Sequence, residues 1–233
     1  MARKKIVFVI VEGPSDAEAL GGILDRLFSN SSVYVHIVHG DITTQKDTDS
    51  RNIVKKITAL VKEYAASRHL KKSHFKEVIH ILDMDGAYID DSCIVLNKAL
   101  GAPVYRDDCI ETARVQGIVD RNHLKRDCLN VISSKEFIWN DLPYQAYFMS
   151  CNLDHVLYNK KNISDEEKQH LSFNFAKEYK DNLELFRTFI LDPEFSLHMM
   201  SYRDSWSFIK KDNRSLKRYT NFGFCILRTD SEK

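Results

Sequence analysis

Three acidic residues directly follow apolar runs that are typical of buried strands. Glu12 comes after the run at 6–11, and Asp83 and Asp85 come after the run at 78–82. Carboxylate oxygens are hard ligands, and Mg²⁺ commonly uses a few of them together with waters and a substrate phosphate. Three converging carboxylates would repel one another unless a cation lay between them. These residues therefore predict a divalent-metal site with Glu12, Asp83 and Asp85 as ligands.

A fourth carboxylate lies close to Glu12 along the chain. Asp16 comes one helical turn later, and Gly13 lets the backbone turn sharply between them. We predict that Asp16 is a further metal ligand; the alternative is a first-turn residue that the helix dipole favours. The segment 40–44 follows another apolar run and would end at the same edge of a sheet. We interpret it as an ordinary loop, with a substrate-lining role as the alternative.

The elements that must position these carboxylates alternate between strands and helices. The β-branched run at 6–11 is apolar on both faces and predicts a strand buried in a parallel sheet, and the runs at 33–38 and 78–82 predict two further strands. Helical spacing of apolar residues predicts one helix from Pro14 and another over about 50–68. Strands joined by helices imply right-handed crossovers and a largely parallel sheet, whose functional crevice lies outside the carboxyl ends of the strands. The sequence therefore predicts an α/β fold.

The second half of the chain differs in amino-acid composition from the first. A short strand near 104–105 and a helix within 115–128 are expected to complete the first unit. After about residue 140 the content of Tyr, Phe, Asn, Asp and Lys increases. There we expect one last strand and then helices; the strand is at 146–149 and the helical spacing is at 166–179, 182–190 and 205–210. We therefore predict a catalytic region at 1–140 and a mainly helical extension at 141–233 that packs on it.

Charge and cysteine content exclude several classes of protein. Lys and Arg number 34 against 33 Asp and Glu, so any site for a polyanion must be local. The five cysteines form no CxxC pair and the histidines show no zinc spacing, which argues against a disulfide framework or a zinc site. No stretch reaches the ~18 apolar residues that a membrane helix needs, and the first apolar run is too short for a signal peptide. We predict a cytoplasmic protein with no membrane partner.

The acidic motifs resemble those of a known domain family. Val-Glu-Gly-Pro-Ser-Asp at 11–16, followed by Asp-Met-Asp at 83–85, resembles the TOPRIM domain of topoisomerases, primases and OLD-family nucleases, and most closely its OLD-family form. The resemblance covers roughly residues 5–110. It implies a Rossmann-like sheet and Mg²⁺ or Mn²⁺ held by Glu12, Asp83 and Asp85, with Asp16 assisting. It also implies cutting or joining of nucleic-acid phosphodiesters.

This resemblance makes a metal-dependent nuclease our main interpretation, with DNA or RNA as its partner in phage defence or nucleic-acid processing. OLD proteins carry an ATPase before this domain. Because the chain has no GxxxxGK[ST] motif, any ATPase would be a separate partner protein. The family also has a further acidic or lysine residue downstream. The spacing does not select among four candidates: Glu111, Lys125, Glu136 and Asp154.

Two other functions remain as alternatives. The segment 82–86, Leu-Asp-Met-Asp-Gly, also matches the start of a haloacid-dehalogenase-like phosphatase, with Asp83 as nucleophile. That interpretation leaves Glu12 unexplained, and that family normally opens its chain with this strand. The other alternative is a non-catalytic TOPRIM-like subunit that binds nucleic acid or a partner. We interpret the basic residues of 210–218 as a solvated helix face, with a nucleic-acid contact as the alternative.

Overall fold

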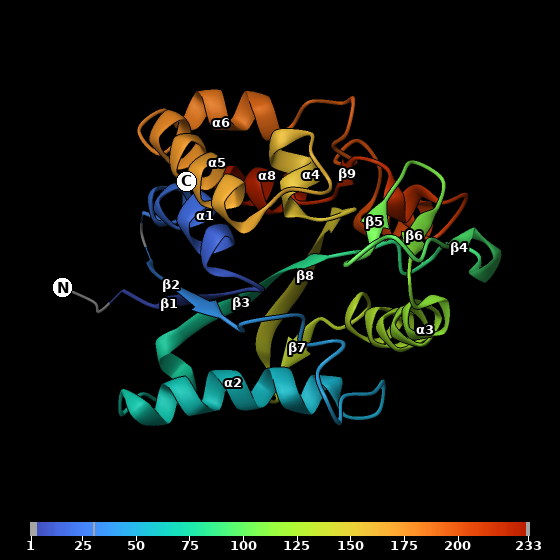
Figure 1. Cartoon of the computed structure of the whole chain (residues 1–233). Coiled ribbons are helices and arrows are strands. Elements are labelled where there is room, and N and C mark those ends of the chain that lie inside the picture. Colours follow the sequence, from blue (N-terminus) through green and yellow to red (C-terminus); the bar gives the residue numbers. More distant parts are fainter. Residues whose placement is uncertain (1–3, 30, 232–233) are drawn as a thin grey trace.

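A mostly parallel sheet divides the molecule into two helical layers (Figure 1). The structure is a computed structural model that describes residues 4–29 and 31–231. The sheet has the order β2-β1-β3-β8-β7, and β9 also pairs with β8. Its parallel strands are β1 (Ile6–Val11), β2 (Ser32–Ile37), β3 (Phe75–Asp83) and β8 (Leu142–Ser150), and its antiparallel strands are β7 (Phe137–Ile138) and β9 (Tyr219–Thr220). The predicted α/β class with a largely parallel sheet is confirmed.

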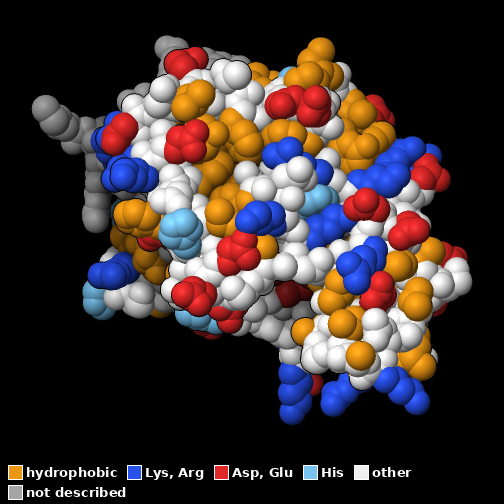
Figure 2. All heavy atoms as spheres, turned by 45° about the horizontal axis from the view of Figure 1, so that its top comes forward, with side chains coloured by type: hydrophobic (Ala, Val, Ile, Leu, Met, Phe, Trp, Pro, Cys, Tyr) orange, Lys and Arg blue, Asp and Glu red, His pale blue; other side chains and the backbone are white. Residues whose placement is uncertain are grey.

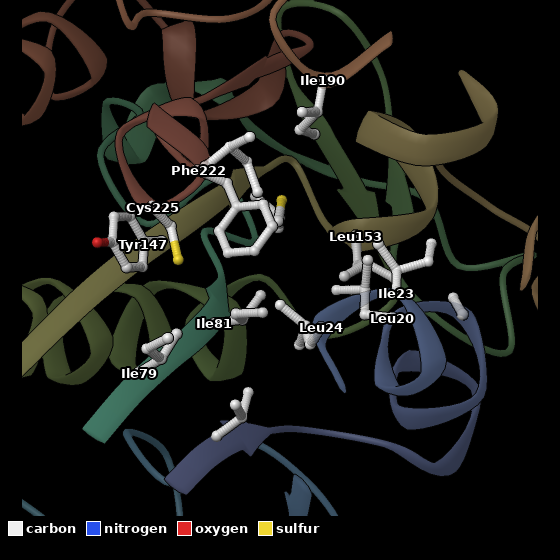
Figure 3. Packing of buried hydrophobic residues seen from close by; sticks show 14 of the residues in the cluster. Leu20, Ile23, Leu24, Ile79, Ile81, Tyr147, Leu153, Ile190, Phe222 and Cys225 are labelled. Atoms are coloured by element: carbon white, nitrogen blue, oxygen red, sulfur yellow. The ribbon is translucent and has the colours of Figure 1, made fainter. Parts of the chain in front are cut away.

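One face of the sheet packs against helices from both halves of the chain. These are α1 (Pro14–Leu27), α4 (Leu153–Tyr158), α5 (Asp165–Tyr179), α6 (Leu183–Ile190) and α8 (Gly223–Ser231). Leu20, Ile23 and Leu24 recur at helical spacing on α1, and all three are buried. Figure 3 shows them in one core with Ile79 and Ile81 of β3. The apolar stripe of α1 therefore fixes this helix on the sheet.

The opposite face carries α2 (Ile53–Ser67), α3 (Val115–Ile132) and α7 (Tyr202–Ile209). Alternate residues of β1 supply both cores: Val7 and Val9 belong to the α1 layer, whereas Phe8 and Ile10 belong to the α2 layer. Because both faces of this strand are buried, its sequence is continuously apolar and does not alternate.

The region after residue 140 completes the sheet. β8 pairs with β3 from Val78↔Tyr144 to Asp83↔Met149, so β3 has parallel neighbours on both sides. The rest of this region is mainly helical, as predicted, and α5 packs along α1. The division of the chain at residue 140 stays a prediction. Strands from both sides of residue 140 belong to the same sheet.

A second, small sheet lies outside the main one. It has the order β4-β6-β5, formed by β4 (Ile94–Leu96), β6 (Ile110–Thr112) and β5 (Val104–Tyr105). The short strand expected near 104–105 is thus present, and it belongs to this small sheet. Short 3-10 turns occur at Lys72–His74, Asp91–Cys93 and Arg214–Leu216. Among the described residues, no helix is both long and apolar enough to cross a membrane.

Gly86 follows the acidic end of β3 in a conformation that other residues rarely adopt. Its φ is +68°, and a Cβ atom there would lie 2.6 Å from Leu216 Cδ2 and 3.0 Å from Ile110 Cδ1. We expect Gly86→Ala to lower the free energy of unfolding by about 1–3 kcal/mol, measured by urea denaturation. Gly101→Ala is the control, because a Cβ atom at that position would have no described neighbour within 4 Å. Equal stability of the two variants would contradict the expectation.

Candidate metal site at the carboxyl ends of the parallel strands

Acidic residues follow all four parallel strands at one edge of the sheet. Glu12 comes after β1, Asp41 after β2, Asp83 at the end of β3, and Asp154 after β8. The carboxyl ends of parallel strands meet at one edge, so these residues gather although they are far apart in sequence. Asp85 lies two residues beyond Asp83, in the left-handed region with φ +48°. Figure 2 shows a hollow on the face it displays, with acidic atoms at its base and Lys and Arg side chains around it.

Glu12 and Asp83 form the centre of this group. The backbone N–H of Asp83 donates to Glu12 Oε1 at 3.1 Å, and Asp83 Oδ1 accepts from the backbone N–H of Leu153 at 2.8 Å. Burial raises the pKa of Glu12 well above its usual range, although the charge of Lys125 opposes the shift. Burial and the neighbouring carboxylates likewise raise the pKa of Asp83. Both carboxyls therefore ionise less readily than a carboxyl in water.

Asp16 occupies the first turn of α1. Its Oδ2 accepts from the backbone N–H of Gly13 at 2.9 Å, which caps the start of the helix. Burial, together with the charge of Asp154, raises the pKa of Asp16 to about 6. The charge of Asp16 in turn contributes to the raised pKa of Asp83. Asp16 thus caps the helix and also borders the site; its role as a metal ligand stays a prediction.

Lys125 of α3 supplies positive charge to the group. Its side chain is fully buried, and its Nζ lies 2.5 Å from Asp85 Oδ2, 2.8 Å from Asp41 Oδ2 and 4.0 Å from Glu12 Oε1. Burial disfavours the ammonium, but the charges of these carboxylates outweigh it and raise the pKa of Lys125 well above its usual range. Lys125 therefore stays protonated and neutralises part of the buried negative charge.

The segment 40–44, which we interpreted as an ordinary loop, holds Asp41 in the site. Thr43 donates to Asp41 Oδ1 from both its backbone N–H, at 2.8 Å, and its hydroxyl, at 2.6 Å. Burial would raise the pKa of Asp41, but the charge and hydrogen bond of Lys125 and the bonds from Thr43 lower it below its usual value. Asp41 is therefore an ionised partner of Lys125. The signal that could have found it is its place after β2, at the same edge as Glu12.

A second lysine and carboxylate pair borders the other side of the group. Lys168 of α5 lies 2.8 Å from Asp154, whose side chain is only 3% exposed, whereas that of Lys168 is 34% exposed. Of the four downstream candidates, Lys125 and Asp154 thus reach the site. Glu111 instead pairs with Arg106 beside the small sheet, and Glu136 is exposed just before β7.

The acidic side chains at this edge offer the type of oxygen ligand that a hard divalent cation prefers. These side chains are carboxylates, and burial, together with the neighbouring carboxylates, raises the pKa values of Glu12, Asp16 and Asp83. Within 4–29 and 31–231, however, no three Asp, Glu, His or Cys side chains stand together in an arrangement that would hold a metal. Among the described residues, Lys125 lies closest to Asp85 and Asp41, at 2.5 and 2.8 Å, and farther from Glu12, at 4.0 Å.

Comparison with known families agrees with this geometry. Residues 7–106 match the Toprim domain. Toprim domains in general bind Mg²⁺ and are typically found in metal-dependent nucleases, primases and topoisomerases. The matched segment contains Glu12, Asp41, Asp83 and Asp85, and it ends before Lys125. No curated protein and no solved structure matches the chain.

Metal binding is expected to release protons and to strengthen as pH rises from about 5.5 to 7.5. The reason is that the raised pKa values of Asp16, Glu12 and Asp83 make protons compete with the cation. Calorimetric titration with Mn²⁺ in buffers of different ionisation enthalpy measures this release. Glu12→Gln should weaken binding strongly, whereas Asp25→Asn, at an exposed position of α1, should not. Affinity that is independent of pH would contradict this expectation.

Removal of the buried ammonium should destabilise the metal-free protein. Lys125→Met leaves Asp41 and Asp85 without their counter-charge, so we expect the free energy of unfolding in EDTA to fall by about 3–5 kcal/mol. Adding Asp41→Asn to this variant should restore part of the loss. Lys168→Met, which removes a partly exposed lysine, should cost less. The interpretation fails if Lys125→Met is as stable as the parent protein in EDTA.

Proposed function

We propose that this chain is an Mg²⁺- or Mn²⁺-dependent nuclease of OLD-like type that cleaves nucleic-acid phosphodiesters. One observation carries the proposal: Glu12 and Asp83 lie side by side, partly buried, at the carboxyl edge of the sheet, within the segment that matches the Toprim domain. Buried carboxylates that resist ionisation are costly for stability, and a cation that they bind offsets this cost. A Toprim domain also implies interaction with nucleic acid.

The residues divide naturally into two roles. Glu12 and Asp83 would hold the cation, with Asp16 and Asp85 beside them. When bound, the cation would polarise the phosphate and lower the pKa of a water nucleophile. Lys168 offers a partly exposed ammonium: burial disfavours its charge, but Asp154 raises its pKa. It can thus pair with a phosphate oxygen of the substrate.

The phosphatase alternative is less well supported. It needs Asp83 as an ionised nucleophile with free access to the substrate. Burial raises the pKa of Asp83, and its Oδ1 accepts a hydrogen bond from Leu153. The non-catalytic alternative does not explain why the acidic set is complete. A place in phage defence or nucleic-acid processing, a separate ATPase partner and a cytoplasmic location remain parts of the proposal.

Cleavage assays test the proposal directly. Supercoiled plasmid, linear duplex, single-stranded DNA and structured RNA are incubated with Mg²⁺, Mn²⁺ or EDTA. We expect metal-dependent cleavage that falls by at least about a hundredfold in Glu12→Gln and in Asp83→Asn, because each change removes a cation ligand. Asp25→Asn, the exposed control, should keep full activity. Turnover of a small phosphomonoester alone, unaffected by Glu12→Gln, would overturn the nuclease assignment in favour of the phosphatase.

A further inference from the structure

A groove with a volume of about 850 Å³ lies away from the acidic site. It runs between the end of α3, β7, the first half of β8 and α7; Figure 1 shows the chain passing from α3 directly into β7. The lining residues of β8 are at its start, Pro143 to Gln145, whereas the acidic site lies beyond its end at Ser150. The groove is therefore separate from the metal site, and its size is in the range of small-ligand sites.

The groove combines aromatic and basic side chains. Phe137 is 46% exposed, Tyr202 is partly exposed, and the buried Trp206 also contributes to the lining. The charged lining residues are mostly positive: Lys135, Arg203, Lys210 and Arg228 against Glu136. Arg228 is paired with Glu77, which leaves three cations for a ligand. Because the whole chain carries a net charge of only +1, this excess is local.

The groove reaches the loop that follows the metal site. The Lys210 ammonium lies 5.5 Å from the ring centroid of Tyr88 and 6.0 Å from that of Trp206. Tyr88 comes three residues after Asp85, and its hydroxyl donates to Asn130 Oδ1 at 2.9 Å. Lys210 thus lies between Trp206, which lines the groove, and Tyr88, which follows the acidic site in the chain.

We propose that this groove binds a single-stranded segment of nucleic acid that continues from the metal site. Exposed aromatic rings such as Phe137 stack unpaired bases of any sequence, and Lys210 and Arg203 pair with the backbone phosphates. A base held in a duplex has no free face for such a ring. The inference rests on the proposed function and specifies the form of the substrate beside the cleaved bond.

Intrinsic fluorescence can report on this groove, because Trp139 and Trp206 are the only tryptophans in the chain. In the Trp139→Phe protein, excitation that is selective for tryptophan over tyrosine gives emission from Trp206 alone. That protein is titrated in EDTA, which prevents cleavage, with a single-stranded oligonucleotide, a duplex of the same sequence, and a mononucleotide. We expect the single strand to change the emission and to bind at least about tenfold more tightly than the other two ligands.

Variants that reverse a charge or remove an aromatic ring test whether the single strand binds in the groove. Arg203→Glu and Lys210→Glu should each weaken single-strand binding by about tenfold, and each should reduce the dependence of affinity on salt. Phe137→Ala should weaken binding with little change in that salt dependence. Lys177→Glu, an exposed change of the same charge on α5, should have no effect. Circular dichroism establishes that each variant is folded.

The outcomes separate this inference from the nuclease proposal. Unchanged binding by the three groove variants, equal binding of the duplex, or tight binding of the mononucleotide alone would each overturn the inference, even if the protein cleaves nucleic acid. Conversely, single-strand binding that depends on the groove, in a protein that shows no metal-dependent cleavage, would support the groove and overturn the nuclease proposal.

Discussion

The structure depends on how buried carboxylates at one edge of the sheet are compensated. Removing a carboxylate from water costs several kcal/mol unless opposite charge or hydrogen bonds replace the lost hydration. Lys125 meets this need for Asp41 and Asp85, and it can do so only because α3 packs against the sheet face that also carries α2. Glu12 lies farther from Lys125, at 4.0 Å, and burial together with the neighbouring carboxylates raises the pKa values of Glu12 and Asp83. The packing of α3 on the sheet therefore determines where the positive charge of Lys125 lies in the site.

The sequence identified the residues whose signals are local. Glu12 and Asp83 directly follow apolar runs, so strand ends and acidic side chains could be recognised together. Lys125 could not be chosen from spacing, because its role depends on which face of α3 meets the sheet and on the register of that contact. Asp41 could be placed at this edge from its position after β2, but its contact with Lys125 depends on the turn that Thr43 stabilises and on the packing of α3. Local patterns locate strand ends, whereas the partners of those ends are set by tertiary packing.

The same distinction applies to the fold. Apolar runs predicted the strands β1, β2 and β3 and the helices between them. The runs of β1 and β3 are continuous because both faces of these strands are buried, whereas β2 lies at the edge of the sheet and is only partly buried. The position of β8 beside β3 was not predictable in this way. Strand order is decided by the pairing of distant segments, here Val78 with Tyr144. Likewise, Val104 and Tyr105 form a strand, but its partner β6 lies in a separate small sheet.

The residues beyond the Toprim match complete the electrostatics of the site. The match ends at residue 106, yet both lysines that border the carboxylates, Lys125 and Lys168, and the buried Asp154 come later in the chain. Among the described residues, the carboxyls at this edge outnumber the two ammoniums close to them, so the site as a whole keeps a deficit of positive charge. Burial raises the pKa values of Glu12 and Asp83, so protons would compete with a divalent cation for these carboxylates. Because Lys125, Asp154 and Lys168 all come from the later segments, these segments set the balance of charge at this edge of the sheet.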